Sequence, residues 1–339
     1  MSLPYVSVVL PFYNASSTLE EALNSIAKQT LSHFEVVMVD DGSEDQSRAI
    51  AHAWCQRDQR FHLCVMPYNQ GVSAAMNRGM AEAKATYVAR MDADDVMLPE
   101  RLERQYAHLQ QHPDLTLVAS CVSLFPEEDI TPGFQRYIDW QNRCLSSAHI
   151  AHEIYWEAPL ANPSVMFVKE TVVALGGVLE GDFPEDYELW LRLNAHGYKM
   201  EKLPQTLLKW RDSAGRLTRT HPRYSREAFD RIRARYLAKD PRLHQGRPLV
   251  IWGAGRPTRK RVAHLLEYGH SVTAWIDIDP KKIGQMLKGV PVQAPTWLEG
   301  LQPKPMVLSY VANHGARSKI EPILRKMDYQ WGKDYLMVG

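Results

Sequence analysis

A regular alternation of short apolar runs and amphipathic segments fills the first hundred residues, and it constrains the fold more than any other feature. The apolar runs have the length and the β-branched content of buried strands, and they cover residues 6–10, 34–39, 61–66 and 87–91. The segments between them carry apolar residues at helical spacing. Repeated strand–helix units predict a parallel sheet with helices on both faces.

The start of the first predicted helix carries its own signal. Thr18 is followed three residues later by Glu21, which is the pattern of a capping box at a helix N-terminus. We therefore expect this helix to begin directly after Thr18, with both side chains bonded to its free backbone N–H groups.

The middle of the chain alternates less regularly. Leu115–Phe125 and residues 164–168 have the composition of strands, and Glu185–Ala195 has the spacing of a helix. Residues 222–237 follow a basic amphipathic pattern, whereas residues 239–247 contain a proline, a glycine and few apolar side chains. We interpret the last of these segments as a linker.

The strand–helix pattern restarts after this linker. Its strands are predicted at residues 249–252, 272–276 and 306–311, and its helices at 257–268 and 317–327. The chain is therefore expected to form a domain of residues 1–240 and a small α/β domain of residues 247–339, each within the ordinary size range of domains.

A glycine pair follows the first strand of the small domain. Gly253-Ala254-Gly255 lies between a strand and a helix, and Asp277 ends the next strand, which matches part of the fingerprint of a Rossmann-like dinucleotide-binding domain. The third glycine position holds Thr258. A glycine turn in a domain that binds no cofactor therefore fits these residues equally well.

Charge and cysteine content exclude several classes of protein. The 40 Lys and Arg residues nearly balance the 39 Asp and Glu residues, so the chain lacks the concentrated positive charge that nucleic-acid binding needs. The four cysteines stand far apart in the sequence, which is typical of reduced thiols in a cytoplasmic protein.

Membrane association would need recruitment to the cytoplasmic face, because no apolar run reaches the ~20 residues that span a bilayer. Arginines concentrate between residues 211 and 247. They belong either to a solvated helix and its flanks or to a basic face toward phosphates or an anionic membrane. The sequence leaves both interpretations open.

Polar clusters follow three of the predicted strands, at residues 11–14, 40–43 and 92–95. Ligands of parallel α/β sheets bind beyond the carboxyl ends of the strands. We therefore expect these three clusters to line one site.

The cluster Asp92-Ala93-Asp94-Asp95 is the most specific of the three. Three carboxylates within four residues repel one another unless a cation compensates them, and such ligands suit Mg²⁺ or Mn²⁺ held together with substrate phosphates. An acidic helix start near Pro99 is the plainer explanation. That explanation does not account for three acids directly after a strand.

Two further motifs are weaker signals. Asp40 and Asp41 either accept hydrogen bonds from a nucleobase or a ribose, or form an ordinary Asp-Gly turn. Arg78 either reaches a diphosphate as a charged donor or is an exposed helical arginine.

An acidic pair, Glu185 and Asp186, opens the helix predicted in the middle of the chain. Acids at a helix start are stabilised by the helix dipole. Alternatively, one of them is a general base, since displacement at an anomeric carbon needs a carboxylate that takes the proton of the acceptor hydroxyl.

In their order and spacing, these motifs resemble the family-two inverting glycosyltransferases with the GT-A fold. The resemblance rests on Val8-Val9-Leu10-Pro11-Phe12-Tyr13-Asn14, Val39-Asp40-Asp41-Gly42-Ser43, Asn69-Gln70-Gly71, Asn77-Arg78-Gly79, Asp92-Ala93-Asp94-Asp95 and Glu185-Asp186-Tyr187-Glu188-Leu189-Trp190. It implies an α/β domain of GT-A type, with a mixed sheet that binds a nucleotide sugar and helices on both faces.

The resemblance also implies roles for single residues. Asp186 would be the catalytic base with Glu185 beside it, and Asp94 with Asp95 would bind the metal. Asp92 would lie nearer the ribose. The other implied contacts to the nucleotide are Pro11, Tyr13, Asn14, Asp40, Asp41 and Arg78.

One segment departs from the family pattern. The family often places a histidine, or an arginine–histidine pair, on a late loop that reaches the metal or the diphosphate. Here Trp210-Arg211-Asp212-Ser213 is followed only later by Arg219-Thr220-His221. His221 is therefore either a third metal ligand or a plain surface histidine.

The sequence thus predicts an inverting glycosyltransferase that depends on Mn²⁺ or Mg²⁺. Its donor would be a nucleoside-diphosphate sugar, with a UDP-sugar favoured, and its acceptor a glycan or a lipid-linked glycan in polysaccharide or glycoconjugate biosynthesis. A sugar nucleotidyltransferase is the first alternative, although Pro11-Phe12-Tyr13-Asn14 stands where its glycine-rich phosphate loop would be. The others are an oxidoreductase acting through the small domain and a binding protein without catalysis.

Overall fold

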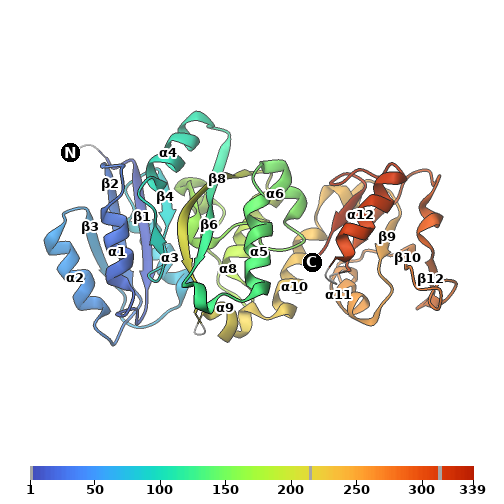
Figure 1. Cartoon of the computed structure of the whole chain (residues 1–339), viewed down its shortest axis with the longest axis horizontal. Helices are drawn as coiled ribbons and strands as arrows, with labels where there is room; N and C mark the ends of the chain where they lie inside the picture. Colours follow the sequence, from blue (N-terminus) through green and yellow to red (C-terminus); the bar gives the residue numbers. More distant parts are fainter. Residues whose placement is uncertain (1–2, 214–215, 312–314) are drawn as a thin grey trace. The chain divides into compact units, whose positions relative to one another are not determined.

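The computed structural model describes residues 3–213, 216–311 and 315–339, which divide into two compact units (Figure 1). The first unit comprises Met1–Ile150 and Pro159–Tyr224, and the second comprises Ala151–Ala158 and Ser225–Gly339. The basic helix that follows residue 225 therefore groups with the second unit, whereas the sequence assigned it to a domain of residues 1–240.

A mixed sheet forms the centre of the first unit. Its strands are β1 (Val6–Phe12), β2 (Phe34–Asp40), β3 (Phe61–Val65), β4 (Tyr87–Arg90), β5 (Val96–Met97), β6 (Leu115–Phe125), β7 (Met166–Val168) and β8 (Lys199–Arg211). They are ordered β3-β2-β1-β4-β7-β6-β8-β5, with the first four parallel and β7 antiparallel to both of its neighbours. The chain order reverses beside β1, and ligands of α/β sheets bind at such a point.

Helices cover both faces of this sheet. The α-helices are α1 (Leu19–Ala27), α2 (Ser47–Arg57), α3 (Val72–Glu82), α4 (Arg101–Gln111), α5 (Pro132–Arg143), α7 (Lys169–Ala174), α8 (Glu185–Ala195) and α9 (Leu217–Thr220), and the 3-10 helices are η1 (Glu127–Asp129), η2 (Asn162–Ser164) and η3 (Pro222–Tyr224). The helix α6 (Ser147–Glu153) is divided between the two units after Ile150.

Neighbouring residues of β1 point to opposite faces of the sheet. Val8 joins the apolar cluster that α1, α2, α4 and α5 form with the sheet. Val9 points to α3 on the other face, where any side chain larger than that of Gly79 would overlap it. The predicted α/β class with helices on both faces is therefore confirmed.

The start of α1 differs from the prediction. The helix begins after Thr18 as expected, but the Thr18 side chain caps no backbone N–H and instead donates to the carbonyl of Ala15 at 3.4 Å. Glu21 pairs with Arg211, which is distant in the sequence. The predicted capping box is wrong, because this ion pair engages the carboxylate that the box would need.

The second unit contains its own sheet. Its elements are α10 (Arg226–Leu237), η4 (Pro241–His244), β9 (Leu249–Trp252), α11 (Arg256–Leu266), β10 (Ala274–Ile276), β11 (Met286–Leu287), β12 (Val290–Gln293), η5 (Pro295–Leu298), β13 (Met306–Ser309), α12 (Ala316–Lys326) and β14 (Tyr335–Met337). The order is β11-β12-β10-β9-β13-β14, and all pairs except β11–β12 are parallel. The predicted linker at residues 239–247 contains η4.

A buried ion cluster holds α10 in the second unit. Asp230 accepts hydrogen bonds from Arg233 at 2.7 Å and from Arg261 of α11 at 3.2 Å. Arg233 also donates to the carbonyl oxygen of Gly339 at 2.7 Å. The partners of Asp230 thus explain why α10 groups with residues that follow it. Along the described stretches of the chain, none of the helices has the length and apolar character needed to cross a bilayer.

Candidate active site

The loops after β1 and β2 lie side by side and are joined by hydrogen bonds. The N–H of Asn14 donates to Ser43 Oγ at 3.0 Å, and the N–H of Glu44 donates to Asn14 Oδ1 at 2.9 Å. Asn14 has a φ of 48°, in the left-handed region that asparagine tolerates. Pro11 is buried within β1, whereas the Tyr13 side chain is 45% exposed, so Tyr13 is the better placed of the two to meet a ligand.

Both carboxylates at the end of β2 are engaged by the protein. Asp40 is fully buried and pairs with Arg48 at 2.6 Å. Asp41 accepts hydrogen bonds from the N–H groups of Gln70 and Gly71 at 2.7 and 2.9 Å. Burial raises the pKa of Asp41, and these two hydrogen bonds oppose it. The two carboxylates therefore fix the loops of this edge, and their contact with a nucleoside stays a prediction.

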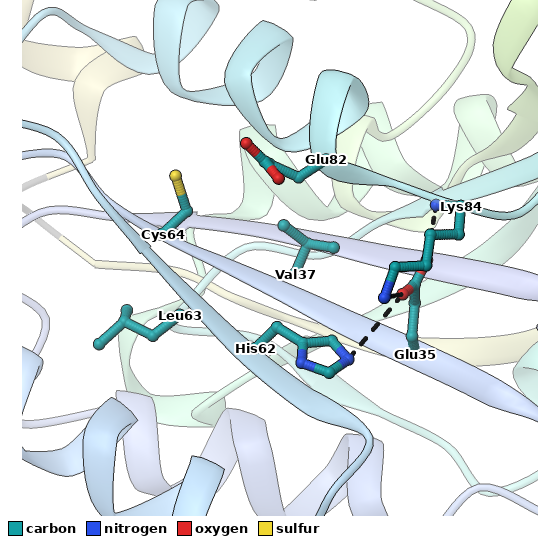
Figure 2. Close-up of a pocket in the computed structure, with 7 residues that line it drawn as sticks. All are labelled: Glu35, Val37, His62, Leu63, Cys64, Glu82 and Lys84. Atoms are coloured by element: carbon teal, nitrogen blue, oxygen red, sulfur yellow. Dashed lines mark hydrogen bonds and ion pairs between the residues drawn. The ribbon is translucent and has the colours of Figure 1, made fainter.

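Arg78 is engaged elsewhere. Its Nε donates to Cys64 Sγ at 3.1 Å, and its guanidinium pairs with Glu82 at 2.6 Å. Cys64 and Glu82 belong to the lining of a pocket of about 240 Å³ between β2, β3 and the end of α3 (Figure 2). None of the acids at residues 92–95 lines this pocket. The contact of Arg78 with a nucleotide stays a prediction.

The acidic loop runs from Asp92 to Asp95, directly after β4. Asp95 is fully buried, its Oδ1 accepts a hydrogen bond from the N–H of Arg211 at 2.8 Å, and its Oδ2 has no partner. Burial and the charges of Asp94 and Asp92 raise the pKa of Asp95 well above its usual range. Burial also raises the pKa of Asp94, against the charges of Arg216 and Arg211. This loop thus holds more negative charge than its neighbours compensate.

Two arginines near the end of β8 face the acidic loop. Arg211 donates to the carbonyl oxygen of Asp94 at 2.7 Å. The guanidinium of Arg216 lies 5.0 Å from the ring centre of Phe134 and 4.4 Å from that of Trp210. Contacts of this kind hold a cation by the negative faces of the rings. Arg216 is therefore a fixed positive charge beside the acids, and sequence reasoning did not single it out.

Asp94 and Asp95 fit the ligand chemistry of Mg²⁺ or Mn²⁺, because both ions prefer carboxylate oxygens and Asp95 Oδ2 is buried without a partner. The third predicted ligand, His221, is exposed, and its Nδ1 accepts a hydrogen bond from the N–H of Arg223 at 3.3 Å. Among residues 3–213, 216–311 and 315–339, no three or more His, Cys, Asp or Glu side chains are grouped to hold a metal. The predicted set of Asp94, Asp95 and His221 is thus not assembled in this structure.

The acidic pair opens α8, as the sequence predicts. Asp186 Oδ1 accepts a hydrogen bond from the N–H of Tyr187 at 2.7 Å. Burial and then the charge of Glu185 raise the pKa of Asp186 to about 7. A carboxylate that titrates near neutral pH has the basicity that a general base needs.

Arg90 connects the acidic loop with the acidic pair. It is 6% exposed at the end of β4, and its Nε and one terminal nitrogen donate to Asp92 Oδ1 at 3.1 and 3.0 Å. Burial acts to lower the pKa of Arg90, but the charges of Asp92, Glu185 and Asp186 outweigh it and raise the pKa. Arg90 therefore lies within electrostatic reach of both acidic groups, which are far apart in the sequence.

A second buried arginine lies beneath the acidic loop. Arg101 donates to the carbonyl oxygen of Arg90 at 2.9 Å and to the side chain of Gln105 at 3.0 Å. Burial lowers the pKa of Arg101, and the charges of Asp95 and Asp92 oppose it. Sequence reasoning missed both arginines, although Arg90 ends a strand of apolar residues, an unusual position that signals a buried partner.

The glycine loop after β9 in the second unit is hydrogen-bonded to Asp277 of the same unit. Gly253 has a φ of 110°, which favours glycine. Asp277 Oδ2 accepts hydrogen bonds from the N–H of Ala254 and from Lys282, both at 3.0 Å. Thr258, at the third glycine position, is buried. Dinucleotide binding by this unit stays a prediction.

Comparison with known proteins identifies the class of enzyme. The model of glycosyl transferase family 2 matches residues 7–171. The amylovoran biosynthesis glycosyltransferase AmsE of Erwinia amylovora is 33% identical over 210 residues, which cover 60% of this chain and 75% of AmsE. The O-antigen biosynthesis glycosyltransferase WbnJ of Escherichia coli is 28% identical over 213 residues, which cover 62% and 80%. This chain belongs to glycosyl transferase family 2, and it is a glycosyltransferase.

Solved structures share the fold. Residues 1–349 of TarS from S. aureus in complex with UDP-GlcNAc match with a TM-score of 0.54 and 15% identity, over 78% of this chain and 80% of that one. The same protein in complex with UDP matches with a TM-score of 0.51 and 18% identity, over 69% and 71%. At this identity the likeness shows the fold, which is of the predicted GT-A type.

Proposed function

We propose that this glycosyltransferase is inverting and metal-dependent, and that it transfers a sugar from a nucleoside-diphosphate sugar to a hydroxyl group of its acceptor. The observation that carries the proposal is the electrostatic link, through Arg90, between the acidic loop and the acidic pair of α8. The acidic loop suits the binding of the leaving diphosphate through a metal ion. The acidic pair suits the removal of the proton from the acceptor hydroxyl.

Asp186 takes the proton of the acceptor hydroxyl in this proposal. As the hydroxyl oxygen forms its bond to the anomeric carbon, the bond from that carbon to the diphosphate oxygen breaks. A single displacement inverts the configuration at the anomeric carbon. The pKa of about 7 allows Asp186 to be ionised before the reaction and still basic enough to accept the proton.

The diphosphate is assigned to the acidic loop. Asp94 and Asp95 would hold Mn²⁺ or Mg²⁺, which when bound stabilises the negative charge of the leaving group. Arg211 and Arg216 add fixed positive charge at the same place. We assign this cationic role to Arg211 and Arg216, and the role of His221 as a third metal ligand stays a prediction.

The nucleoside is assigned to the loops after β1 and β2. Tyr13 offers an exposed ring there, and the neighbouring backbone is fixed by Asn14, Asp40 and Asp41. Asp92, which accepts hydrogen bonds from Arg90, is assigned to the ribose. TarS, which shares the fold, has been solved with UDP and with UDP-GlcNAc, and this supports a UDP-sugar as the favoured donor.

The acceptor is assigned to the glycans. AmsE and WbnJ carry the names of amylovoran and O-antigen biosynthesis, and this supports a role in the assembly of a polysaccharide or glycoconjugate. We place the reaction in the cytoplasm, with peripheral contact to the cytoplasmic face of the membrane if the acceptor is lipid-linked.

Donor turnover tests the proposal. The protein is incubated with Mn²⁺, a panel of UDP-sugars and a mixture of glycan acceptors, and UDP release is measured for the wild type and for Asp94→Ala and Asp186→Asn. Both variants should lose activity, by about 10²- to 10⁴-fold for the missing base. Asp182→Asn is the matched control, since Asp182 is exposed shortly before α8.

Three results would count against the proposal. A rate near that of the wild type in Asp186→Asn would remove the base assignment. Release of pyrophosphate from UTP and a sugar 1-phosphate, with no UDP released from any UDP-sugar, would indicate a nucleotidyltransferase. A product with the anomeric configuration of the donor, determined by NMR, would exclude inversion.

A further inference from the structure

Tyr224 contacts the acidic pair from the start of the segment that the sequence marks only as basic and amphipathic. Its hydroxyl donates to Glu185 Oε2 at 2.6 Å, and Glu185 is only 3% exposed. A terminal nitrogen of Arg223 lies 4.0 Å from the same oxygen, and the other lies 3.4 Å from Glu180. Glu185 therefore accepts a short hydrogen bond from the neutral hydroxyl of Tyr224, and the charged Arg223 lies at the distance limit of an ion pair.

The two acids of the pair differ in what faces them. Glu185 faces Tyr224 and Arg223, whereas Asp186 faces Arg90 and Asp92, which come from β4 and the acidic loop. Two neighbouring carboxylates in a poorly solvated site are not both ionised easily, so the pair tends to share one proton. The partners of each acid decide which of them carries it.

The Tyr224 hydroxyl favours the ionised form of Glu185, because a hydrogen-bond donor stabilises a carboxylate more than a carboxylic acid. Burial and the charges of Glu185 and Asp186 raise the pKa of Tyr224, so the hydroxyl keeps its proton and remains a donor. When the pair holds one proton, this contact leaves that proton on Asp186.

We propose that Tyr224 is a positioning residue, which holds Glu185 ionised and in place and thereby makes Asp186 the proton acceptor of the pair. The inference rests on the proposed function. In this proposal Tyr224 contacts neither the acceptor nor the donor, and it acts only through Glu185.

A direct titration of Asp186 tests the proposal in the full chain without relying on catalysis. The protein is labelled with ¹³C at its aspartate carboxyl carbons, and the signal that is missing in Asp186→Asn identifies Asp186. Tyr224→Phe removes the hydroxyl and keeps the ring. We expect the titration midpoint of Asp186 to fall by about one pH unit, since the charge of Glu185 that raises it is then no longer held by the Tyr224 hydroxyl.

The exposed Tyr198 provides a matched control, and Tyr198→Phe should leave the midpoint where it is in the wild type. If a UDP-sugar is turned over, the acid limb of the pH–rate profile should move to lower pH in Tyr224→Phe as well. A uniform loss of rate at every pH would overturn the proposal, because a purely structural role predicts that result.

Glu185→Gln gives an independent variant if Tyr224→Phe does not fold. It removes the charge of Glu185 and keeps an oxygen that accepts the Tyr224 hydrogen bond. The midpoint of Asp186 should fall here too, and adding Tyr224→Phe should produce no further fall, since both changes act through one group. An unchanged midpoint in Glu185→Gln, or in a folded Tyr224→Phe, overturns the proposal. Lack of turnover of every UDP-sugar would refute the proposed donor, while the titration still decides the role of Tyr224.

Discussion

Replacing Asp186 by asparagine should make the protein more stable at alkaline pH while removing its activity. Burial and the charge of Glu185 raise the pKa of Asp186 from 3.8 to about 7, so the fold disfavours the ionised carboxylate. The stability that such a group contributes is fully present below pH 3.8 and is lost as the pH rises through about 7. Asparagine stays neutral and still accepts the hydrogen bond from the N–H of Tyr187, so the variant avoids this loss.

The size of the effect follows from the pKa. A difference of one pH unit corresponds to about 1.36 kcal/mol, so a pKa raised from 3.8 to about 7 corresponds to about 4 kcal/mol of unfolding free energy above pH 8. The side chain of Asp186 is partly open to solvent, which screens the charge, and we expect about half of that value. For a domain of about 200 residues, 2 kcal/mol raises the Tm by roughly 4 to 8 °C.

Thermal unfolding followed by circular dichroism measures this difference between the wild type and Asp186→Asn at several values between pH 5 and pH 8.5. The Tm advantage of the variant should grow with pH. Asp182→Asn is the control, because this exposed carboxylate lies shortly before α8 and its loss should leave the Tm nearly unchanged. An advantage that is constant across the pH range, or a variant less stable than the wild type at pH 8.5, would refute the reasoning.

Three further predictions concern packing, cationic groups and the metal. Gly79→Ala should destabilise the first unit by about 2 kcal/mol in urea unfolding, because the added Cβ overlaps the side chain of Val9; an unchanged midpoint would contradict this. Arg216→Ala should lower kcat/KM for the donor by about 10- to 100-fold in the UDP-release assay, whereas His221→Ala should lower it less than about 3-fold. The reverse ranking would contradict the role of Arg216 and favour His221 as a metal ligand. Removal of divalent ions with EDTA should stop turnover and Mn²⁺ should restore it, and full turnover in EDTA would exclude metal dependence.

The fold of the first hundred residues was predictable because its signals are local. The β-branched runs predicted as strands match β1, β2, β3 and β4 to within one or two residues. The order of β7, β6, β8 and β5 was not predictable, since pairing between distant and partly antiparallel strands leaves no periodic pattern in the sequence. The grouping of α10 with the second unit also depends on distant partners, namely the contacts of Asp230 with Arg233 and Arg261.

The candidate site was predictable where its residues form short clusters at element ends. The acidic loop and the acidic pair of α8 stand out because several acids are adjacent in the sequence. Arg90, Arg216 and Tyr224 are single residues in segments with other patterns, and only their spatial partners give them a role. An arginine at the end of the apolar strand β4 was the one available signal, since arginine is rarely buried without a partner.

The distribution of charge in the site indicates that the acidic loop, rather than the acidic pair of α8, is the place where a cation would bind. Arg90 lies within electrostatic reach of Asp92 and the acidic pair of α8, and Arg101 lies beneath the acidic loop, within reach of Asp95 and Asp92. Arg211 and Arg216 offset part of the burial at Asp94, but the pKa of Asp94 and the pKa of Asp95 both remain raised. The pKa of Asp186 is raised to about 7 as well, which suits a carboxylate that exchanges a proton. The side assigned to the diphosphate keeps an excess of negative charge, which a divalent ion arriving with the donor would neutralise.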